Sequence, residues 1–270
     1  MTTNWSAAAF QLPPIASTVG PFAGSAWLET WWQHRGTGEL LLAATSHSLV
    51  ALTVDEGTVR FAGEADLTDY HSPLGSPEVP ALAEAITSLP EGTELDFDSL
   101  PDEAATAVAN SLKGAGLRPH REKHNVTAVL HLPETFDDYL MSLGKKERHE
   151  VRRKRRRFAN ETGEYRVERR SGPEAVALFA RLHRLSSGDK GTFMTDEMEN
   201  FFLALHTSAG GVIDVLVDGS DRPASAIFSF EDSHGFYLYN SAYEPEMRSL
   251  SPGNVMLSHL IERAIEDRRQ

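Results

Sequence analysis

The sequence predicts an α/β fold built from two consecutive halves, each with a mixed sheet and flanking helices. Segments with strand periodicity alternate with segments of helical periodicity in both halves. The 270 residues are enough for one large domain or two ordinary ones. A hydrophobic content of 40% is typical of a well-packed globular protein. We place the boundary at Pro133, so the two predicted domains are residues 1–132 and 133–270.

In the first half, a Pro-containing leader precedes a helix over residues 21–34. Its Trp27 and Trp31 lie one turn apart, and we interpret them as packing residues rather than a ligand cage. The Asp-Glu-Gly turn at 55–57 joins two strands as a hairpin. The predicted strands cover residues 39–45, 48–54, 58–64, 93–98 and 125–132, and the other helices cover 78–88 and 102–114.

The second half follows a regular order of strands and helices. A short helix over 135–143 precedes a basic helix over 145–161, and Thr195 caps a later helix that ends near residue 207. The terminal helix begins at Pro252, with apolar residues at helical spacing. The remaining elements are strands over 164–170, 211–219, 222–232 and 234–243 and a helix over 173–187.

Composition excludes several kinds of protein. The chain has no cysteine, so disulfides, thiolate nucleophiles and cysteine metal sites are excluded. Its N-terminus lacks a basic region followed by an apolar core, and no apolar run approaches the ~18–20 residues that span a membrane. We therefore expect a cytoplasmic protein without a membrane span. The net charge of −13 argues against general affinity for nucleic acid.

The stretch from 234 to 265 predicts an anion site, because a strand and short loop lead into a helix start. Ser251 is a natural N-cap and Pro252 a natural first helical residue. Gly253 lets a ligand approach the backbone closely. A helix start presents unpaired N–H groups and a positive dipole end, which suit phosphate. Most capped helices bind nothing, but a preceding strand favours a ligand site.

Several stretches, in order, resemble CelD/BcsL-type acyltransferases of the GNAT superfamily. They are 25–36, 66–77, 135–158, 178–193 and the cofactor-loop segment 240–266. The resemblance implies two tandem GNAT-like halves, the first degenerate and the second binding acetyl-CoA or another acyl-CoA. It implies no metal, and an amine acceptor in a small molecule or cell-envelope precursor. The residues it assigns to the cofactor are Asn240, Ser241, Ser251, Pro252, Gly253, Asn254 and Val255.

Candidate catalytic groups lie near the end of the strand over 234–243. Tyr243 is a candidate general acid toward the leaving thiolate, and Glu244 a candidate base. Strict alternation would place Tyr237, Tyr239, Ser241 and Tyr243 on one face, and Phe236, Leu238, Asn240 and Ala242 on the core face. In the structural alternative, the tyrosines only pack against the sheet.

Other candidates lie outside this strand. His183, on the helix over 173–187, is a candidate base or substrate ligand, although a lone helix histidine is more often structural. Asp69 and Tyr70, in an acidic and aromatic cluster, are candidate substrate-binding residues together with Tyr239. The same cluster also contains ordinary turn formers.

The helix over 145–157 carries nine of the 26 Lys and Arg residues and only two acids. It is a solvated basic face, or it holds an anionic acceptor or the cofactor's 3′-phosphate, or it docks RNA. RNA would fit a Fem-like transferase that uses aminoacyl-tRNA, which is the alternative function. A non-catalytic CoA-binding module is the second alternative.

The family resemblance implies one further strand after the terminal helix, beside residues 234–243. Only five charged or polar residues follow Ile265 in this sequence. We therefore expect the second half to lack its usual last strand and to turn over acyl groups weakly or not at all. We also expect the open edge to be covered by a homodimer partner or by an N-terminal segment.

Overall fold

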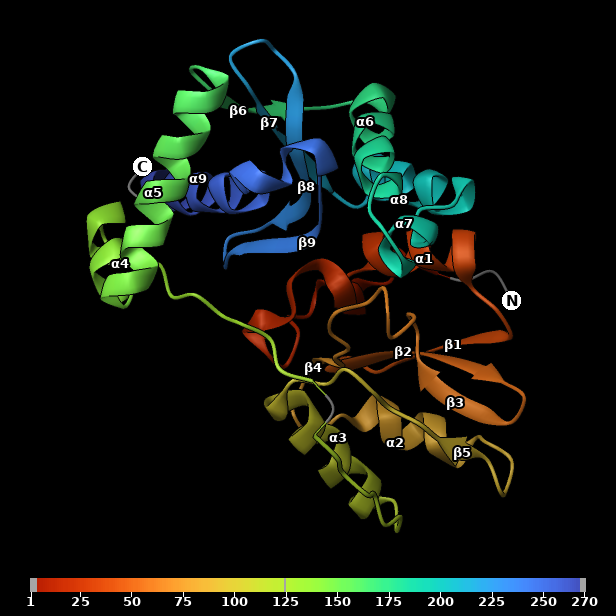
Figure 1. Ribbon diagram of the computed structural model, residues 1–270. Helices are drawn as coiled ribbons and strands as arrows, with labels where there is room; N and C mark the ends of the chain where they lie inside the picture. The colour runs from red at the N-terminus through yellow and green to blue at the C-terminus, as the bar shows by residue number, and fades with distance from the viewer. Residues whose placement is uncertain (1–3, 124, 268–270) are drawn as a thin grey trace. The chain divides into compact units, whose positions relative to one another are not determined.

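The computed structural model describes residues 4–123 and 125–267 and confirms the α/β class (Figure 1). The chain divides into two compact units. The N-terminal unit contains the described residues up to Val126 and the turn Asp232–Gly235, and the C-terminal unit contains Thr127–Glu231 and the residues from Phe236 onward. Among the described residues, no helix is long and apolar enough to cross a membrane.

The N-terminal unit is a small sheet with helices packed on it. Its strands run in the order β1-β2-β3-β5, with β4 also paired to β2, and the β3–β5 pair is parallel while the others are antiparallel. Its elements are η1 (Ala8–Gln11), η2 (Ser17–Ala23), α1 (Ser25–Arg35), β1 (Glu39–Ala44), β2 (Ser48–Asp55), β3 (Thr58–Phe61), β4 (Leu74–Gly75), α2 (Pro80–Thr87), β5 (Glu94–Leu95) and α3 (Asp102–Gly114).

The predicted hairpin and the tryptophan packing are confirmed in this unit. Glu56 and Gly57 both have positive φ, as a two-residue hairpin turn requires, and Asp55 pairs with Thr58. Trp27 and Trp31 are buried in α1. The predicted helix over 21–34 starts later, at Ser25, because Pro21 lies in the preceding 3-10 turn.

The predicted strand over 125–132 is wrong. These residues pair with no strand in the described structure, and Val126 and Val129 are 85% and 57% exposed. Alternating apolar residues mark a strand only where a neighbouring strand accepts their backbone hydrogen bonds. The strands predicted over 58–64 and 93–98 exist but are shorter, as β3 and β5.

The C-terminal unit contains a four-stranded antiparallel sheet in the order β6-β7-β8-β9. The short helix α7 was not predicted. The elements are α4 (Phe136–Ser142), α5 (Lys145–Thr162), β6 (Arg166–Arg170), α6 (Pro173–Arg184), α7 (Asp189–Phe193), α8 (Asp196–Ser208), β7 (Val212–Val217), β8 (Pro223–Glu231), β9 (Phe236–Tyr243), η3 (Pro245–Leu250) and α9 (Pro252–Asp267).

Helices cover both faces of this sheet (Figure 1). On one face α5 and α9 pack through Phe158, Val255 and Met256 against the sheet residues Leu216 and Ile227. On the other face Phe179 of α6 and Phe202 of α8 form a buried aromatic layer with Phe228 and Phe230 of β8. Strand β9 forms one end of the sheet order.

A bulge interrupts the pairing of β8 with β9. Phe228 pairs with Asn240, but the next β8 residue, Ser229, pairs with Leu238, so Tyr239 is the extra residue. One inserted residue exchanges the faces of all side chains beyond it. The bulge therefore decides which β9 side chains reach which helix layer.

Candidate functional site

The end of β9, the turn η3 and the start of α9 form one continuous loop. Ser251 precedes α9 as predicted, but in a left-handed conformation with φ of 57°. Its backbone carbonyl, rather than its hydroxyl, accepts hydrogen bonds from the N–H groups of Asn254 and Val255. Pro252 has no N–H group. These bonds leave the Gly253 N–H as the one helix-start donor that has no hydrogen-bond acceptor among the described residues.

The space beside Gly253 is open. A Cβ atom built on Gly253 would meet no heavy atom within 4 Å, and the adjacent Asn254 is exposed. An incoming group can therefore contact this backbone directly. The side chains of Pro252 and Val255 are buried, so they fix the helix start. The predicted contacts of Ser251, Pro252, Asn254 and Val255 with a cofactor stay predictions.

One cation beside this loop was missed by sequence reasoning. Arg248, in η3, is exposed and makes no ion pair within 4 Å in the described structure. Its backbone carbonyl accepts a hydrogen bond from Ser251, which holds it one short turn before the helix start. The signal in the sequence that could have identified Arg248 is its position five residues before Gly253. Arg248 is suited to contact an anion that binds at α9.

Glu244 and Tyr243 lie where β9 ends. The Glu244 carboxylate is largely buried, and its Oε2 lies 3.8 Å from the guanidinium of Arg181 on α6. Its backbone N–H donates to the carbonyl of Ala224 on β8. Tyr243 is half-buried and pairs with Ser225 across the sheet. The catalytic roles of both residues stay predictions.

The predicted grouping of the tyrosines on one face is wrong because of the bulge. Tyr237 pairs with Phe230 and therefore faces the α6/α8 layer, whereas Tyr243, beyond the bulge, faces α9. Tyr239 packs in the aromatic layer, with its ring centroid 5.5 Å from Phe230. Leu238, assigned to the core face, is 40% exposed.

The structure brings His183 and Asn240 together on the α6/α8 face. The His183 ring is 1% exposed, and its Nε2 lies 3.2 Å from Asn240 Oδ1. The same oxygen accepts a hydrogen bond from the Ser241 backbone N–H at 2.8 Å. Burial, and then the charge of Lys190, hold the pKa of His183 below its usual value. A neutral His183 donating from Nε2 therefore fixes the amide of Asn240 beside the bulge.

Asp69 and Tyr70 lie between β3 and β4 in the N-terminal unit. Asp69 is exposed, and the Tyr70 ring is half-buried, 6.2 Å from that of Phe22. Their neighbours on both sides belong to the core: Thr68 accepts a hydrogen bond from the Trp27 indole, and buried His71 pairs with Asp98. The cluster is thus partly structural, and binding of a substrate by Asp69 and Tyr70 stays a prediction.

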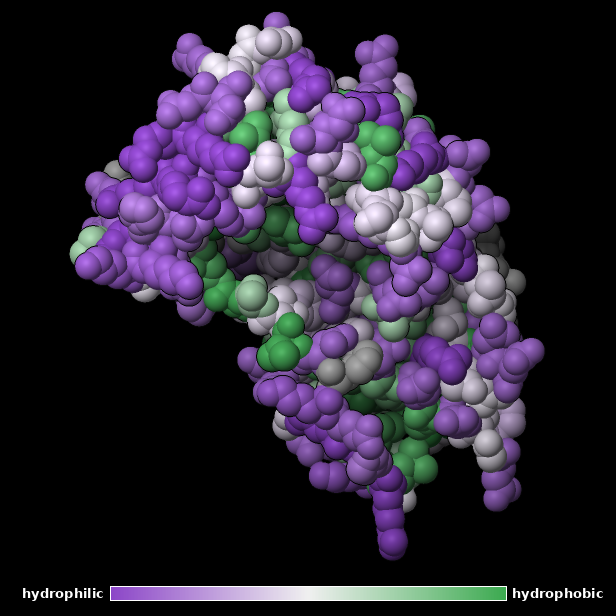
Figure 2. Space-filling model, in the orientation of Figure 1, coloured by the Kyte–Doolittle hydropathy of each residue, from purple (hydrophilic) through white to green (hydrophobic). Residues whose placement is uncertain are grey.

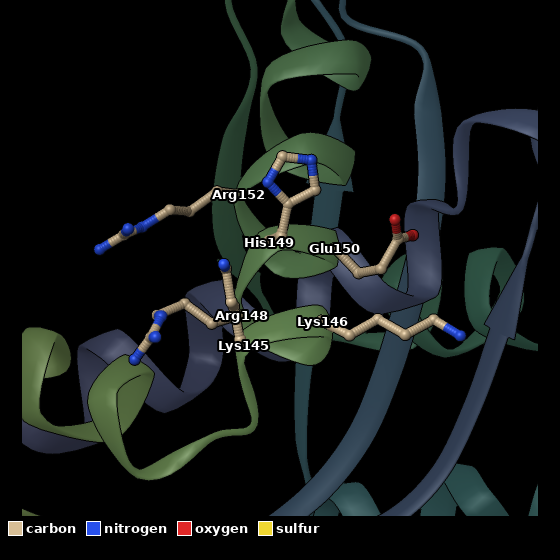
Figure 3. A pocket seen from close by; sticks show the side chains of 6 residues that line it. All are labelled: Lys145, Lys146, Arg148, His149, Glu150 and Arg152. Carbon is tan, nitrogen blue, oxygen red and sulfur yellow. The ribbon is translucent and has the colours of Figure 1, made fainter.

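The basic helix α5 lies beside α9 but away from the helix start. Arg155 forms an ion pair with Glu262, which is ten residues, or about 15 Å along a helix, beyond Pro252. The open depression of about 560 Å³ against α5 is lined by Lys145, Lys146, Arg148, His149, Glu150 and Arg152 (Figure 3). Because these residues all belong to one helix end, the depression is distinct from the loop before α9.

No group of three or more His, Asp or Glu side chains is placed to hold a metal ion in the part of the chain that the structure describes. The site's polar groups are backbone N–H groups, one exposed arginine, a tyrosine, a glutamate and the His183–Asn240 pair. Such groups bind anions, orient a carbonyl group and transfer protons.

The chain is similar to known proteins in sequence pattern over its C-terminal part and in overall fold. Residues 145–270 match the family model of the acetyltransferase (GNAT) domain. No curated protein matches the sequence. Among solved structures, the chain is similar to FemX at 14% identity and a TM-score of 0.60, covering 99% of this chain and 85% of that one.

Two other structures are similar. L-PGS from Bacillus licheniformis has 11% identity and a TM-score of 0.54, covering 89% of this chain and 72% of that one. A conserved protein of unknown function from Bacteroides thetaiotaomicron has 13% identity and a TM-score of 0.57, covering 96% and 82%. At these identities the likeness establishes the fold. The C-terminal unit is therefore similar to GNAT acetyltransferase domains within a Fem-like fold, which supports acyl transfer as the general chemistry.

Proposed function

We propose that the C-terminal unit is an N-acyltransferase that binds acyl-CoA at the start of α9 and transfers the acyl group to an amine. The observation that carries the proposal is the open helix start at Gly253. There a backbone N–H without a hydrogen-bond acceptor among the described residues and the positive end of the helix dipole face open space, and exposed Arg248 lies five residues earlier in the same loop.

The cofactor's pyrophosphate would accept a hydrogen bond from the Gly253 N–H and pair with Arg248. Its pantetheine arm would then run along β9 toward the bulge. The edge of β9 near Asn240 and Ser241 supplies the polar groups nearest that path. This placement uses Asn240, Ser241 and Gly253 from the set that the family resemblance implies, and adds Arg248.

In the transfer step, the acceptor amine attacks the thioester carbonyl, the carbon–sulfur bond breaks, and the CoA thiolate leaves. The ammonium proton goes to a base, for which Glu244 is the candidate, and the thiolate takes a proton from Tyr243. Arg181, whose guanidinium lies 3.8 Å from the Glu244 carboxylate, would orient that carboxylate. The acceptor's identity, as a small molecule or an envelope precursor, is part of the proposal.

Native mass spectrometry with added acetyl-CoA tests the donor. We expect a mass shift of one CoA species per chain, and release of free thiol when an accepted amine is present. No shift with acetyl-CoA, together with transfer from aminoacyl-tRNA, would replace the proposal with the Fem-like alternative. A shift without thiol release against any amine would favour the non-catalytic module.

A further inference from the structure

We propose that the outer face of α5, with the segment that leads into it, is a docking surface for an anionic lipid bilayer. This surface lies within the C-terminal unit and does not depend on the acyltransferase proposal. The bilayer is inferred from two independent features of the described residues, a stripe of cations and a neighbouring set of exposed apolar side chains.

The cations form a continuous stripe. Lys145, Arg148, Arg152 and Arg156 follow each other at intervals of three, four and four residues, which places them on one helix face over about 16 Å. Figure 3 shows Arg148 and Arg152 extending to the same side of α5, and Lys146 and Glu150 to the other. Glu150 therefore lies away from this face. The other glutamate of the basic stretch, Glu147, accepts a hydrogen bond from the backbone N–H of Gly144 at the helix start.

The stripe faces away from the unit's core. Phe158, two residues or about 200° beyond Arg156, is buried against α9. On the stripe, the one carboxylate contact within 4 Å in the described structure joins Arg152 to Asp137 at 3.7 Å, and both side chains are more than half exposed. Such an exposed pair is weak. Like charges three and four residues apart oppose helix formation, so an anionic partner would relieve repulsion along the stripe.

The apolar component lies immediately before the stripe. Within the C-terminal unit, the three most exposed large hydrophobic side chains are Met141, Val129 and Leu130, at 65%, 57% and 46%. All three belong to the segment 127–141. The Arg148 guanidinium lies 3.1 Å from the Met141 sulfur, so the apolar segment meets the stripe at Met141. Figure 2 shows a predominantly hydrophilic surface over α5.

A bilayer fits both features better than nucleic acid does. Anionic headgroups attract clusters of four to eight cations, and apolar side chains beside them enter the acyl boundary. Single-stranded nucleic acid is instead bound by cations with exposed aromatic side chains for stacking. The aromatic residue within α5, Phe158, is buried, and Phe136 and Tyr139 of α4 are half-buried, so the exposed large apolar side chains nearby are the non-aromatic Val129, Leu130 and Met141.

Flotation with phospholipid vesicles tests the proposal. The full chain should bind vesicles of phosphatidylcholine with phosphatidylglycerol, bind pure phosphatidylcholine much less, and dissociate as salt rises. Removing two charges with Arg152→Gln and Arg156→Gln should lower the partition coefficient by about 30-fold. Met141→Ser should weaken binding at constant charge.

The matched control is Lys113→Gln with Arg118→Gln, which removes two exposed charges from the N-terminal unit. It should leave vesicle binding unchanged, and circular dichroism should show that all variants are folded. The proposal is overturned if the wild type fails to bind anionic vesicles, or if the control loses as much binding as the stripe variant. It is also overturned if duplex RNA binds α5 at a salt concentration where vesicles do not.

Discussion

The strongest test of the fold concerns Asp214 on β7, which is 0% exposed and contacts two arginines. Arg263 on α9 donates two hydrogen bonds to it at 2.7 and 2.6 Å, and Arg169 on β6 approaches at 3.4 and 3.3 Å. Burial opposes the ionisation of Asp214, but the hydrogen bonds from Arg263 and Arg169 outweigh it, so its pKa lies below the usual value. This group ties α9, and with it the proposed site, to the sheet.

Asp214→Asn removes the charge while keeping the shape. Loss of one partner of a buried ion pair costs ~3–5 kcal/mol, and we expect ~3 because Arg263 and Arg169 retain contact with water, at 25% and 44% exposure. With a urea dependence of ~2 kcal/mol per M, the unfolding midpoint should fall by ~1.5 M. Replacing the pair together, by Asp214→Leu with Arg263→Met, should cost much less, because no charge is left unpaired and Arg169 keeps its contact with Glu231.

Urea unfolding followed by circular dichroism measures this effect. The four tryptophans lie in the N-terminal unit, so their fluorescence provides a separate reading of that unit. Because the folded pKa of Asp214 is depressed, its stabilisation is present at neutral pH and disappears as pH falls below ~4. The difference between wild type and Asp214→Asn should shrink over that range. An unchanged dichroism midpoint at neutral pH would refute the reasoning.

Three further predictions concern other parts of the structure. The pKa of His183 is lowered in the folded protein, so the free energy of unfolding should fall as pH drops through ~6.5, where the unfolded chain binds the proton. His183→Gln should reduce this dependence of stability on pH in unfolding measurements from pH 7 to 5, and an unchanged dependence would contradict the prediction. Gly219→Ala should cost ~1–3 kcal/mol in unfolding experiments, because its Cβ would lie 2.6 Å from the Thr162 carbonyl oxygen; wild-type stability would show that this contact relaxes freely. Leu238→Lys on β9 should reduce self-association in sedimentation velocity if a second copy covers this edge, and identical sedimentation of a monomeric wild type would remove that partner.

The parts of the fold that the sequence predicts well are those set by local signals. Thr195 caps α8 through its side chain, as predicted. The helix predicted from residue 135 begins one residue later, because Thr135 caps α4 in the same way. The hairpin at Glu56 and Gly57 follows from turn chemistry. The predicted strand over 125–132 fails because pairing depends on a neighbouring strand, which local alternation does not reveal.

The candidate site shows the same difference between features set by local sequence and features set by the packing of distant residues. The start of α9 after Ser251 was predictable, because Ser-Pro-Gly marks a helix start. The face of the sheet on which each β9 side chain lies was not predictable, because the bulge at Tyr239 depends on the pairing of β8 with β9. This bulge moves Tyr243 to the α9 face. The contact of His183 with Asn240 joins residues 57 positions apart and likewise depends on how α6 packs on the sheet.

The measurement that tests the central claim most directly is calorimetric titration of acetyl-CoA into the wild type, Gly253→Asp and Gly253→Ala. A negative charge in the first turn of α9 interacts favourably with the positive end of the helix dipole, so Gly253→Asp should fold. The same charge should repel the pyrophosphate. We expect Gly253→Asp to weaken binding about 30- to 1000-fold, from ~2–4 kcal/mol of lost contacts and repulsion. Gly253→Ala should have a much smaller effect, because its Cβ meets open space. Unchanged affinity of folded Gly253→Asp for acetyl-CoA would contradict binding of acyl-CoA at this helix start.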